Sequence, residues 1–284
     1  QFANIAWYFR SVPEQCGAPL VVSFYGWDYE LLPFLYPEFE AHLQALFQQA
    51  DRLICEGSHG AKILQEKGCP KEKIAVIRLG VKVKEIAWVA RTKSKETLRL
   101  IQIASFTEKK GHIYTVKAFA KALETCPQME LTLVGGARDP AVKAAVLKFI
   151  EEQKLGAKIT ILDHLDFSKL HLILAEYQVF IHPSCYAANR DCEGGEPLVI
   201  LDAQATGMPV IATDHCDIPE EVVHGTTGLL APERDPEQLA IYIERFYQME
   251  NEEYQEFSRK AREHVATFYD ITENGKALKA VNDA

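Results

Sequence analysis

The stretch EGGEPLVILDAQATGMPVIATD, residues 193–214, reads as a helix followed by a strand. Pro197 suits the first turn of a helix, and Gly207 suits the position just after its end. The MPVIATD segment that follows is a continuous apolar run of strand length. Asp202 falls inside the helix, where an acid among apolar neighbours is costly unless it has a partner. We therefore expect a buried helix with Glu193 near its N-terminal end and a polar site around it.

Apolar runs of strand length recur outward from this stretch, with helical segments between them. They are continuous rather than alternating, which is typical of parallel strands covered on both faces. Residues 112–124, for example, place their apolar side chains on one helical face. This alternation predicts an α/β fold with doubly wound parallel sheets. The expected strands are 19–25, 51–57, 73–80, 98–105, 129–136, 157–164, 177–184 and 208–214.

A Lys-rich polar segment, 81–97, separates two series of strands and helices. The first series has too few strands for a complete Rossmann-like domain, so we expect its leading strands to be absent. The second series is complete. The expected parts are an incomplete N-terminal domain over 1–85, a linker over 86–97, a C-terminal domain over 98–262 and a closing helix over 263–284.

The bulk composition narrows the class of protein. A chain of 284 residues with 48% hydrophobic content fits one large or two medium globular domains. The net charge of −9 argues against a nucleic-acid partner. Seven scattered cysteines without a CxxC pair indicate neither a disulfide framework nor a zinc site. Because this cysteine pattern suits a reducing compartment, we expect a cytoplasmic location. No apolar run reaches the length of a membrane-spanning helix.

Four segments at the expected carboxyl ends of strands are candidates for a ligand site: 105–112, 133–139, 161–166 and 182–207. Lys109 and Lys110 precede a glycine and a helix start, which suits a phosphate, although a solvated lysine pair is the alternative. The acidic and glycine-rich loop before the helix of 197–207 lies where amides and the helix dipole favour an anion. An exposed loop acid at Glu193 and a salt-bridged helix residue at Asp202 are the alternatives there.

The pattern HPS…EGGEPLVILDAQATGMPVIAT…DIPEEVVHGTTGLLAPERD, residues 182–235, resembles the donor-site signature of GT-B glycosyltransferases of the GT4 kind, or glycosyltransferase group 1. It is most similar to the colanic-acid and exopolysaccharide branch. Agreement extends through EKKGH, LVGG, GCPKEKIAVIRLGV and PLVVSFYGWD. The resemblance implies two Rossmann-like domains facing across a cleft, with the donor bound mostly by the C-terminal one. It also implies that the closing helix crosses back onto the first domain.

The resemblance assigns donor-site roles by position. It implies that Lys110 grips the donor pyrophosphate, while Ser105 stands where the family usually has an arginine. It implies that Glu193 holds sugar hydroxyls near the anomeric carbon and that Asp202 binds the ribose. Because one extra residue lengthens the spacing between these acids, Glu196 competes with Glu193 for the first role. The remaining expected donor-binding residues are Gly135, Asp163, His164, Gly194, Gly195, Leu198 and Val199.

On the acceptor side we expect Tyr25, Gly26 and Asp28, where the family often shows Phe-His-Gly and this chain has Phe24-Tyr25-Gly26. A tyrosine can donate a hydrogen bond but is a poor general base near neutral pH. Base catalysis by Tyr25 is therefore not expected. Glu193 and Lys110 are the expected catalytic residues.

The implied activity is retaining, metal-independent transfer of a hexose from a nucleotide-sugar to a saccharide or lipid-linked acceptor. The implied setting is cell-surface polysaccharide biosynthesis, with no cofactor besides the donor. The implied mechanism is front-face transfer, in which a donor phosphate oxygen helps to remove the acceptor proton. A non-catalytic nucleotide-sugar-binding module and a GT-B epimerase or phosphorylase are the alternatives. Peripheral contact with the inner face of the membrane is left open.

Overall fold

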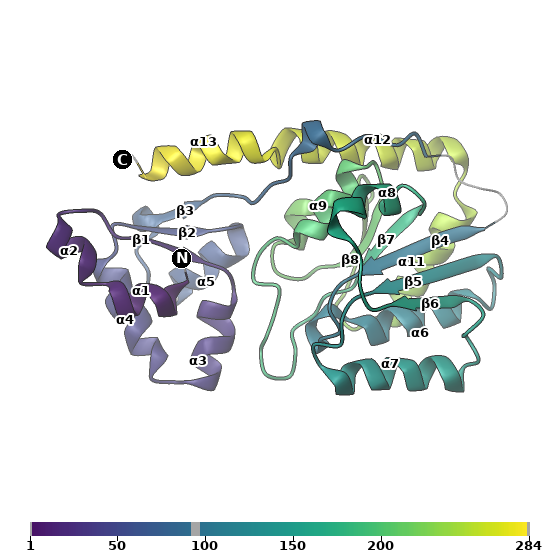
Figure 1. The fold of residues 1–284 in the computed structure, drawn as a ribbon, viewed down its shortest axis with the longest axis horizontal. Helices are drawn as coiled ribbons and strands as arrows, with labels where there is room; N and C mark the ends of the chain where they lie inside the picture. Colours follow the sequence, from purple (N-terminus) through teal and green to yellow (C-terminus); the bar gives the residue numbers. More distant parts are fainter. Residues whose placement is uncertain (1, 92–96, 283–284) are drawn as a thin grey trace.

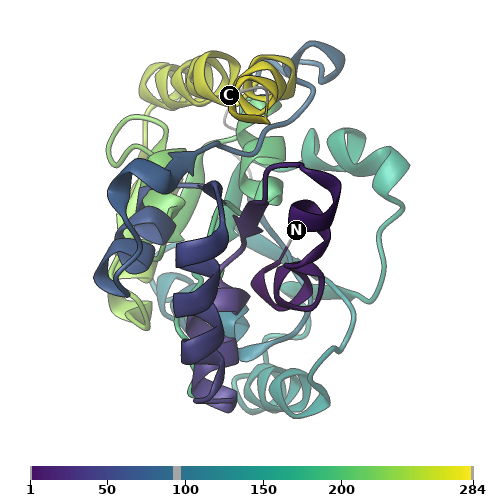
Figure 2. The same ribbon diagram turned by 90° about the vertical axis from the view of Figure 1, so that its left-hand side faces the viewer.

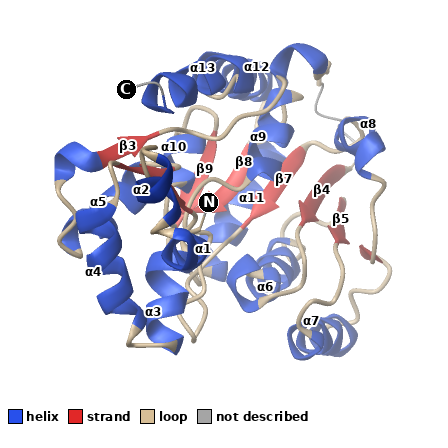
Figure 3. Ribbon diagram, turned by 60° about the vertical axis from the view of Figure 1, so that its left-hand side comes forward, coloured by secondary structure: helices blue, strands red, loops and turns tan. Residues whose placement is uncertain are grey.

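The computed structural model describes residues 2–91 and 97–282, which form two lobes (Figure 1). The N-terminal lobe holds a three-stranded sheet and the C-terminal lobe a six-stranded sheet. Two helices from the end of the chain run along one side of both lobes (Figures 1 and 3). The linker expected over 86–97 contains residues 92–96, which lie outside the described residues.

The sheet of the N-terminal lobe is parallel, with strand order β1-β2-β3. Its core packs the buried side chains of Phe24, Leu43, Phe47 and Leu53. Figure 2 views the molecule from the side of this lobe. That the lobe is an incomplete domain stays a prediction. Its strands are β1 (Val21–Phe24), β2 (Arg52–Cys55) and β3 (Ile74–Val76). Its helices are α1 (Ala3–Phe9), α2 (Val12–Cys16), α3 (Leu32–Leu35), α4 (Phe39–Gln49) and α5 (Ser58–Glu66).

The sheet of the C-terminal lobe is also parallel, with order β6-β5-β4-β7-β8-β9. All eight expected strands are present, each shorter than expected. Sequence reasoning missed β9, a four-residue strand that begins at Gly228 next to a turn. The strands are β4 (Leu98–Ile103), β5 (Met129–Val134), β6 (Ile159–Leu162), β7 (Val179–His182), β8 (Val210–Thr213) and β9 (Gly228–Ala231).

Helices cover both faces of this sheet, which confirms the prediction of doubly wound parallel strands. In β4, Leu98 and Leu100 belong to the core beneath α6 and α11, whereas Ile101 and Ile103 belong to the core beneath α8 and α9. This two-sided burial is why the strand sequences read as continuous apolar runs. The helices are α6 (His112–Ala122), α7 (Pro140–Glu152), α8 (Leu170–Leu174), α9 (Leu198–Ala205), α10 (Ile218–Glu221) and α11 (Pro236–Gln248).

The last two helices return to the N-terminal lobe. Helices α12 (Asn251–Phe268) and α13 (Ile271–Asn282) replace the single closing helix expected over 263–284. A break at Tyr269 and Asp270 pairs with Val81, and the Asn274 amide donates to the Leu79 carbonyl. Helix α13 therefore lies against the loop that follows β3, the last strand of the N-terminal lobe. The expected domain bounds stay a prediction.

Candidate active site

Lys110 and Glu193 meet beyond the carboxyl ends of β4 and β7. Lys110 ends a 3-10 turn that follows β4, and its carbonyl accepts a hydrogen bond from Gln102. Gly111, with a φ of 66°, turns the chain from there into α6. The Lys110 Nζ lies 2.7 and 2.6 Å from the two carboxylate oxygens of Glu193. The structure therefore brings together the two residues that sequence reasoning selected as catalytic.

Glu193 has two further partners from the end of β7. The Ser184 hydroxyl donates to its Oε1 at 2.5 Å, and His182 Nε2 lies 3.2 Å from the same oxygen. The side chain is only 6% exposed. Burial alone would raise the pKa of Glu193, but the Lys110 ammonium and the His182 hydrogen bond outweigh it and hold the pKa well below its usual range. Glu193 is therefore an ionised carboxylate, suited to accept hydrogen bonds.

The loop after Glu193 packs directly on the N-terminal lobe. Gly194 and Gly26 both have positive φ, and a Cβ on Gly194 would lie 2.1 Å from the Gly26 Cα. A Cβ on Gly195 would lie 1.6 Å from a carboxylate oxygen of Glu56. The Tyr29 hydroxyl also donates to the Gly194 carbonyl. Gly194 thus admits the main chain of the Gly26 turn, and Gly195 admits the Glu56 side chain. That the loop also binds a diphosphate stays a prediction.

Glu196 turns away from Lys110. Its Oε2 accepts a hydrogen bond from the Leu79 amide at 2.9 Å, and its Oε1 lies 3.8 Å from Arg78. Burial raises the pKa of Glu196 to about 8. Of the two acids that competed for the sugar-binding role, the structure places Glu193 against the lysine.

Asp202 finds its partner on a neighbouring helix. It is the fifth residue of α9, and its Oδ1 lies 2.7 Å from His171 Nε2 on α8. Burial raises the pKa of Asp202, while the His171 hydrogen bond lowers it. Pro197 precedes the first turn by one residue, and Gly207 follows the helix end as expected. Sequence reasoning gave no signal for His171, because only the packing of α8 on α9 brings it close.

The other expected donor-site residues lie at neighbouring strand ends. Ser105 is half-buried in the loop after β4, and a Cβ on Gly135 would meet the Ala104 carbonyl of that loop at 1.9 Å. Asp163 and His164 are exposed after β6, and Asp163 pairs with Lys143 of α7. Of the two residues at the start of α9, Leu198 is exposed and Val199 is half-buried.

Among the residues expected on the acceptor side, Asp28 binds nearby backbone amides. Its carboxylate accepts hydrogen bonds from the amides of Ala3 at 2.6 Å and Tyr25 at 3.0 Å, and the side chain is fully buried. Burial raises its pKa to about 6, although these amides lower it. Gly26 touches the donor-side loop, and Tyr25 is half-buried beside Phe2, with ring centroids 4.7 Å apart. Asp28 thus fixes the turn that carries Tyr25 and Gly26.

Comparison with known proteins identifies the chain's family. Residues 84–264 match the family model described as glycosyl transferases group 1. The chain belongs to this family. It is 30% identical over 250 residues to the putative colanic acid biosynthesis glycosyltransferase WcaL of Escherichia coli K12, covering 87% of this chain and 59% of that protein. It is also 30% identical to the amylovoran biosynthesis glycosyltransferase AmsK of Erwinia amylovora, covering 81% and 55% respectively. The chain thus spans less than two thirds of these relatives.

Solved structures confirm the expected GT-B fold. HepE of Anabaena, in complex with UDP and glucose, superposes with a TM-score of 0.78 at 17% identity, covering 97% of this chain and 74% of that one. Sucrose-phosphate synthase of Thermosynechococcus elongatus superposes with a TM-score of 0.78 at 20% identity, covering 97% and 71%. At these identities the likeness establishes the fold alone.

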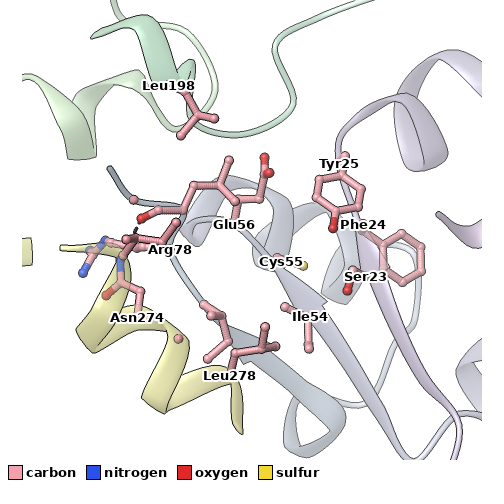
Figure 4. Close-up of a pocket in the computed structure, with 15 residues that line it drawn as sticks. Ser23, Phe24, Tyr25, Ile54, Cys55, Glu56, Arg78, Leu198, Asn274 and Leu278 are labelled. Atoms are coloured by element: carbon pink, nitrogen blue, oxygen red, sulfur yellow. Dashed lines mark hydrogen bonds between the residues drawn. The ribbon is translucent and has the colours of Figure 1, made fainter. Parts of the chain in front are cut away.

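This group 1 chain has a cavity of about 260 Å³ where the N-terminal lobe meets α9 and α13 (Figure 4). It is lined mainly by apolar side chains from the ends of β1 to β3, with Glu56 and Arg78 as its charged members. Among the described residues, no group of three or more His, Cys, Asp or Glu side chains is placed to hold a metal ion. No described helix is long and apolar enough to cross a bilayer. Metal independence stays a prediction.

Proposed function

We propose that this chain transfers a hexose from a nucleoside diphosphate sugar to a saccharide or lipid-linked acceptor in exopolysaccharide biosynthesis. The observation that carries the proposal is the Lys110–Glu193 pair, placed beyond two adjacent strand ends and facing the other lobe. In parallel α/β sheets ligands bind at that edge. The names of the relatives, which refer to colanic acid and amylovoran, support the polysaccharide setting.

Each residue has a distinct task in this proposal. The diphosphate competes with Glu193 for the Lys110 ammonium, which then stabilises the charge that develops on the leaving group. The released Glu193 carboxylate accepts hydrogen bonds from hydroxyls of the transferred sugar. Amides of Leu198 and Val199 at the start of α9 face the phosphates. Asp202, held by His171, binds the ribose.

The finer parts of the proposal follow from the family resemblance. Transfer retains the anomeric configuration, a donor phosphate oxygen helps to remove the acceptor proton, and no metal ion takes part. The protein works in the cytoplasm, with peripheral contact at the inner face of the membrane when the acceptor is lipid-linked. UDP, which is present in the HepE complex, is the first nucleotide to test.

A two-step experiment tests the proposal. A thermal-shift panel of UDP-, GDP- and dTDP-hexoses identifies the donor, because a ligand at 100 times its Kd stabilises by about 2.7 kcal/mol. Release of the nucleoside diphosphate is then followed with and without acceptor oligosaccharides, in the presence of EDTA. Acceptor-dependent release supports a metal-independent transferase. Saturable binding without release would instead assign a binding module, and cleavage of a glycoside by orthophosphate to give a sugar 1-phosphate would indicate a phosphorylase. A panel that binds nowhere would refute the proposal.

A further inference from the structure

His215 holds the backbone of Glu193 from behind the site. It lies two residues beyond the end of β8 and is 1% exposed. The Glu193 amide donates a hydrogen bond to His215 Nε2, at a nitrogen–nitrogen distance of 3.1 Å. On the other side of the ring, Nδ1 lies 2.6 Å from a carboxylate oxygen of Glu233. One imidazole thus bridges the loop that carries Glu193 and a half-buried acid.

This geometry fixes the tautomer of His215. A backbone amide only donates, so Nε2 accepts and carries no hydrogen. Nδ1 therefore carries the hydrogen and donates it to Glu233, and the ring is neutral. Although burial raises the pKa of Glu233, hydrogen bonds from His215 and from the Tyr186 amide lower it overall, which keeps the acceptor ionised. Cys216 Sγ also lies close to this nitrogen, at 3.2 Å from Nε2.

Tyr186 completes the support and links it to the other lobe. Its amide donates to the second carboxylate oxygen of Glu233 at 3.0 Å, so both oxygens are occupied. Its ring meets the His215 ring edge-on, with centroids 4.9 Å apart at 79°. Its hydroxyl lies 3.1 Å from His59 Nε2, at the start of α5 in the N-terminal lobe.

The loop lacks regular secondary structure, so individual hydrogen bonds set its position. Besides His215, Lys109 binds the Cys192 carbonyl and the Tyr29 hydroxyl binds that of Gly194. In the described stretch 183–197 the chain forms neither helix nor strand, and Gly194 and Gly195 follow Glu193 directly. In the free protein Lys110 also restrains the Glu193 carboxylate. Once a diphosphate takes over the lysine, that restraint is lost, and the carboxylate is held by Ser184 and His182 directly and by His215 through the backbone.

We propose that His215 is a positioning residue that holds Glu193 through its backbone amide, with Glu233 setting the tautomer of the ring. The inference rests on the proposed function for its effect on turnover, but the hydrogen bond and the placement of Glu193 exist independently of turnover. It adds two residues, His215 and Glu233, that sequence reasoning did not select.

Two variants and a matched control separate positioning from general stability. His215→Phe keeps a planar aromatic ring and removes both hydrogen bonds. His215→Gln places a carbonyl oxygen within reach of the Glu193 amide. His224→Phe is the control, because His224 Nδ1 accepts a similar hydrogen bond from the Leu230 amide at 3.0 Å, outside the site.

Misplacement of a catalytic group by about 1 Å lowers the rate about 100-fold, so we expect kcat to fall about 10- to 100-fold in His215→Phe. His215→Gln should recover part of this loss, and His224→Phe should match the wild type. UDP affinity should change less than about twofold in all three.

Nuclear magnetic resonance tests the same inference without turnover. In the wild type we expect a scalar coupling between the Glu193 amide nitrogen and His215 Nε2, and nitrogen shifts of an imidazole protonated at Nδ1. The pKa of Glu193, read from its carboxyl carbon, should rise toward its ordinary value in His215→Phe and stay low in His224→Phe. A protonated Nε2, an unchanged Glu193 pKa in a folded His215→Phe, or full kcat in that variant would overturn the inference. If His215→Phe does not fold, the wild-type coupling and His215→Gln decide. If the wild-type protein shows no turnover, the proposed function is refuted. The resonance results then decide by themselves whether His215 positions Glu193.

Discussion

Lys110 and Glu193 neutralise each other with little exposure to solvent. The side chains are 18% and 6% exposed, and removal of either one leaves the other charge without its main partner. In the proposed function, this pair belongs to the free site, and each member occupies the place of a ligand group. This explains how a buried carboxylate stays ionised before a donor arrives, and it gives the two residues opposite effects on nucleotide binding.

Lys110→Ala should weaken nucleoside diphosphate binding by about 1.5–3 kcal/mol, because one charge-assisted contact to the phosphates is lost. Calorimetry with UDP measures the change. Lys148→Ala is the matched control, since Lys148 is an exposed lysine of α7 that pairs only weakly with Glu152 at 3.7 Å. Equal affinities for the Lys110 variant and the wild type would show that Lys110 does not bind the phosphates.

Glu193→Gln should lower kcat while UDP binds as tightly as before or more tightly. The amide keeps the shape of the side chain but no longer holds the Lys110 ammonium against a competing phosphate. Steady-state kinetics and calorimetry on the same preparation measure both quantities. Glu196→Gln serves as the comparison, since Glu196 contacts Leu79 rather than the lysine. If that variant alone loses kcat, the sugar-binding role belongs to Glu196.

Asp202→Asn should weaken UDP and UDP-sugar binding by the same factor, because its proposed partner is the ribose that both ligands share. The neutral amide also weakens the bond to His171, so the side chain loses the orientation that α8 provides. Titration of each ligand by calorimetry gives the two factors. A loss confined to the UDP-sugar would place Asp202 beside the transferred sugar instead.

At the scale of elements, the sequence predicted what is encoded locally. Pro197 and Gly207 bound α9 to within one residue, and continuous apolar runs located eight strands, because helix ends and buried strands leave signals in adjacent residues. The partners of the acids were not predictable in this way. His171, His182 and His215 reach them from other elements, and their placement depends on packing over the whole sheet.

The glycine loop also shows the limit of local reasoning. The GG pair correctly indicated a close backbone approach, but not which partner approaches. A Cβ on Gly194 would collide with the backbone of Gly26 in the other lobe, where the nearest atom belongs to main chain and cannot turn aside. This interlobe contact therefore depends on the absence of a side chain at both Gly194 and Gly26.

Gly194→Ala should hold the lobes apart and lower kcat about 10- to 100-fold, because the donor-side loop can no longer close on the Gly26 turn. Gly225→Ala is a matched control. Its φ of 76° resembles the 73° of Gly194, and its added Cβ meets nothing within 4 Å among the described residues. Both variants incur about 1–2 kcal/mol of left-handed backbone strain, so the difference between them reports the collision alone. Hydrogen exchange at residues 26–30 should be faster in Gly194→Ala only; equal exchange in the two variants would show that the contact is dispensable.

At the scale of the whole molecule, acidic side chains form much of the contact between the two lobes. Asp217 and Glu220 of the C-terminal lobe accept hydrogen bonds from the amides of His59 and Ser58 at the N-terminus of α5, where the helix dipole favours negative charge. Arg78 adds an ion pair to Glu220 at 2.7 Å. We call this interlobe contact the seam. It joins segments more than a hundred residues apart, so no local pattern in the sequence predicts it.

Three more carboxyls lie in the same seam with few positive charges near them. Burial raises the pKa of Glu56 to about 7 and of Glu196 to about 8, and it raises that of Glu221 well above its usual range. Glu221 is fully buried, and neither carboxyl oxygen has a hydrogen-bond partner among the described residues. The closed seam therefore favours the protonated acids.

Stability should fall as the pH rises from about 6.5 to 8.5. In this window the folded protein binds more protons than the unfolded chain, whose glutamates ionise near pH 4.3, so the free energy of unfolding decreases with pH. Groups whose pKa is lowered by folding act in a different pH range. Burial lowers the pKa of His112 to about 3, so this residue raises the free energy of unfolding as the pH rises from about 3 to 6.5, below the window above.

Thermal midpoints and the radius of gyration from small-angle scattering, measured from about pH 6.5 to 8.5, test this prediction. Both should change with pH, because the protein becomes less stable and the lobes separate. Glu56→Gln combined with Glu196→Gln mimics the protonated acids and should flatten both curves, whereas Glu152→Gln, an exposed acid of α7, should leave them unchanged. An equally steep fall in the double variant would assign the titration to groups other than Glu56 and Glu196.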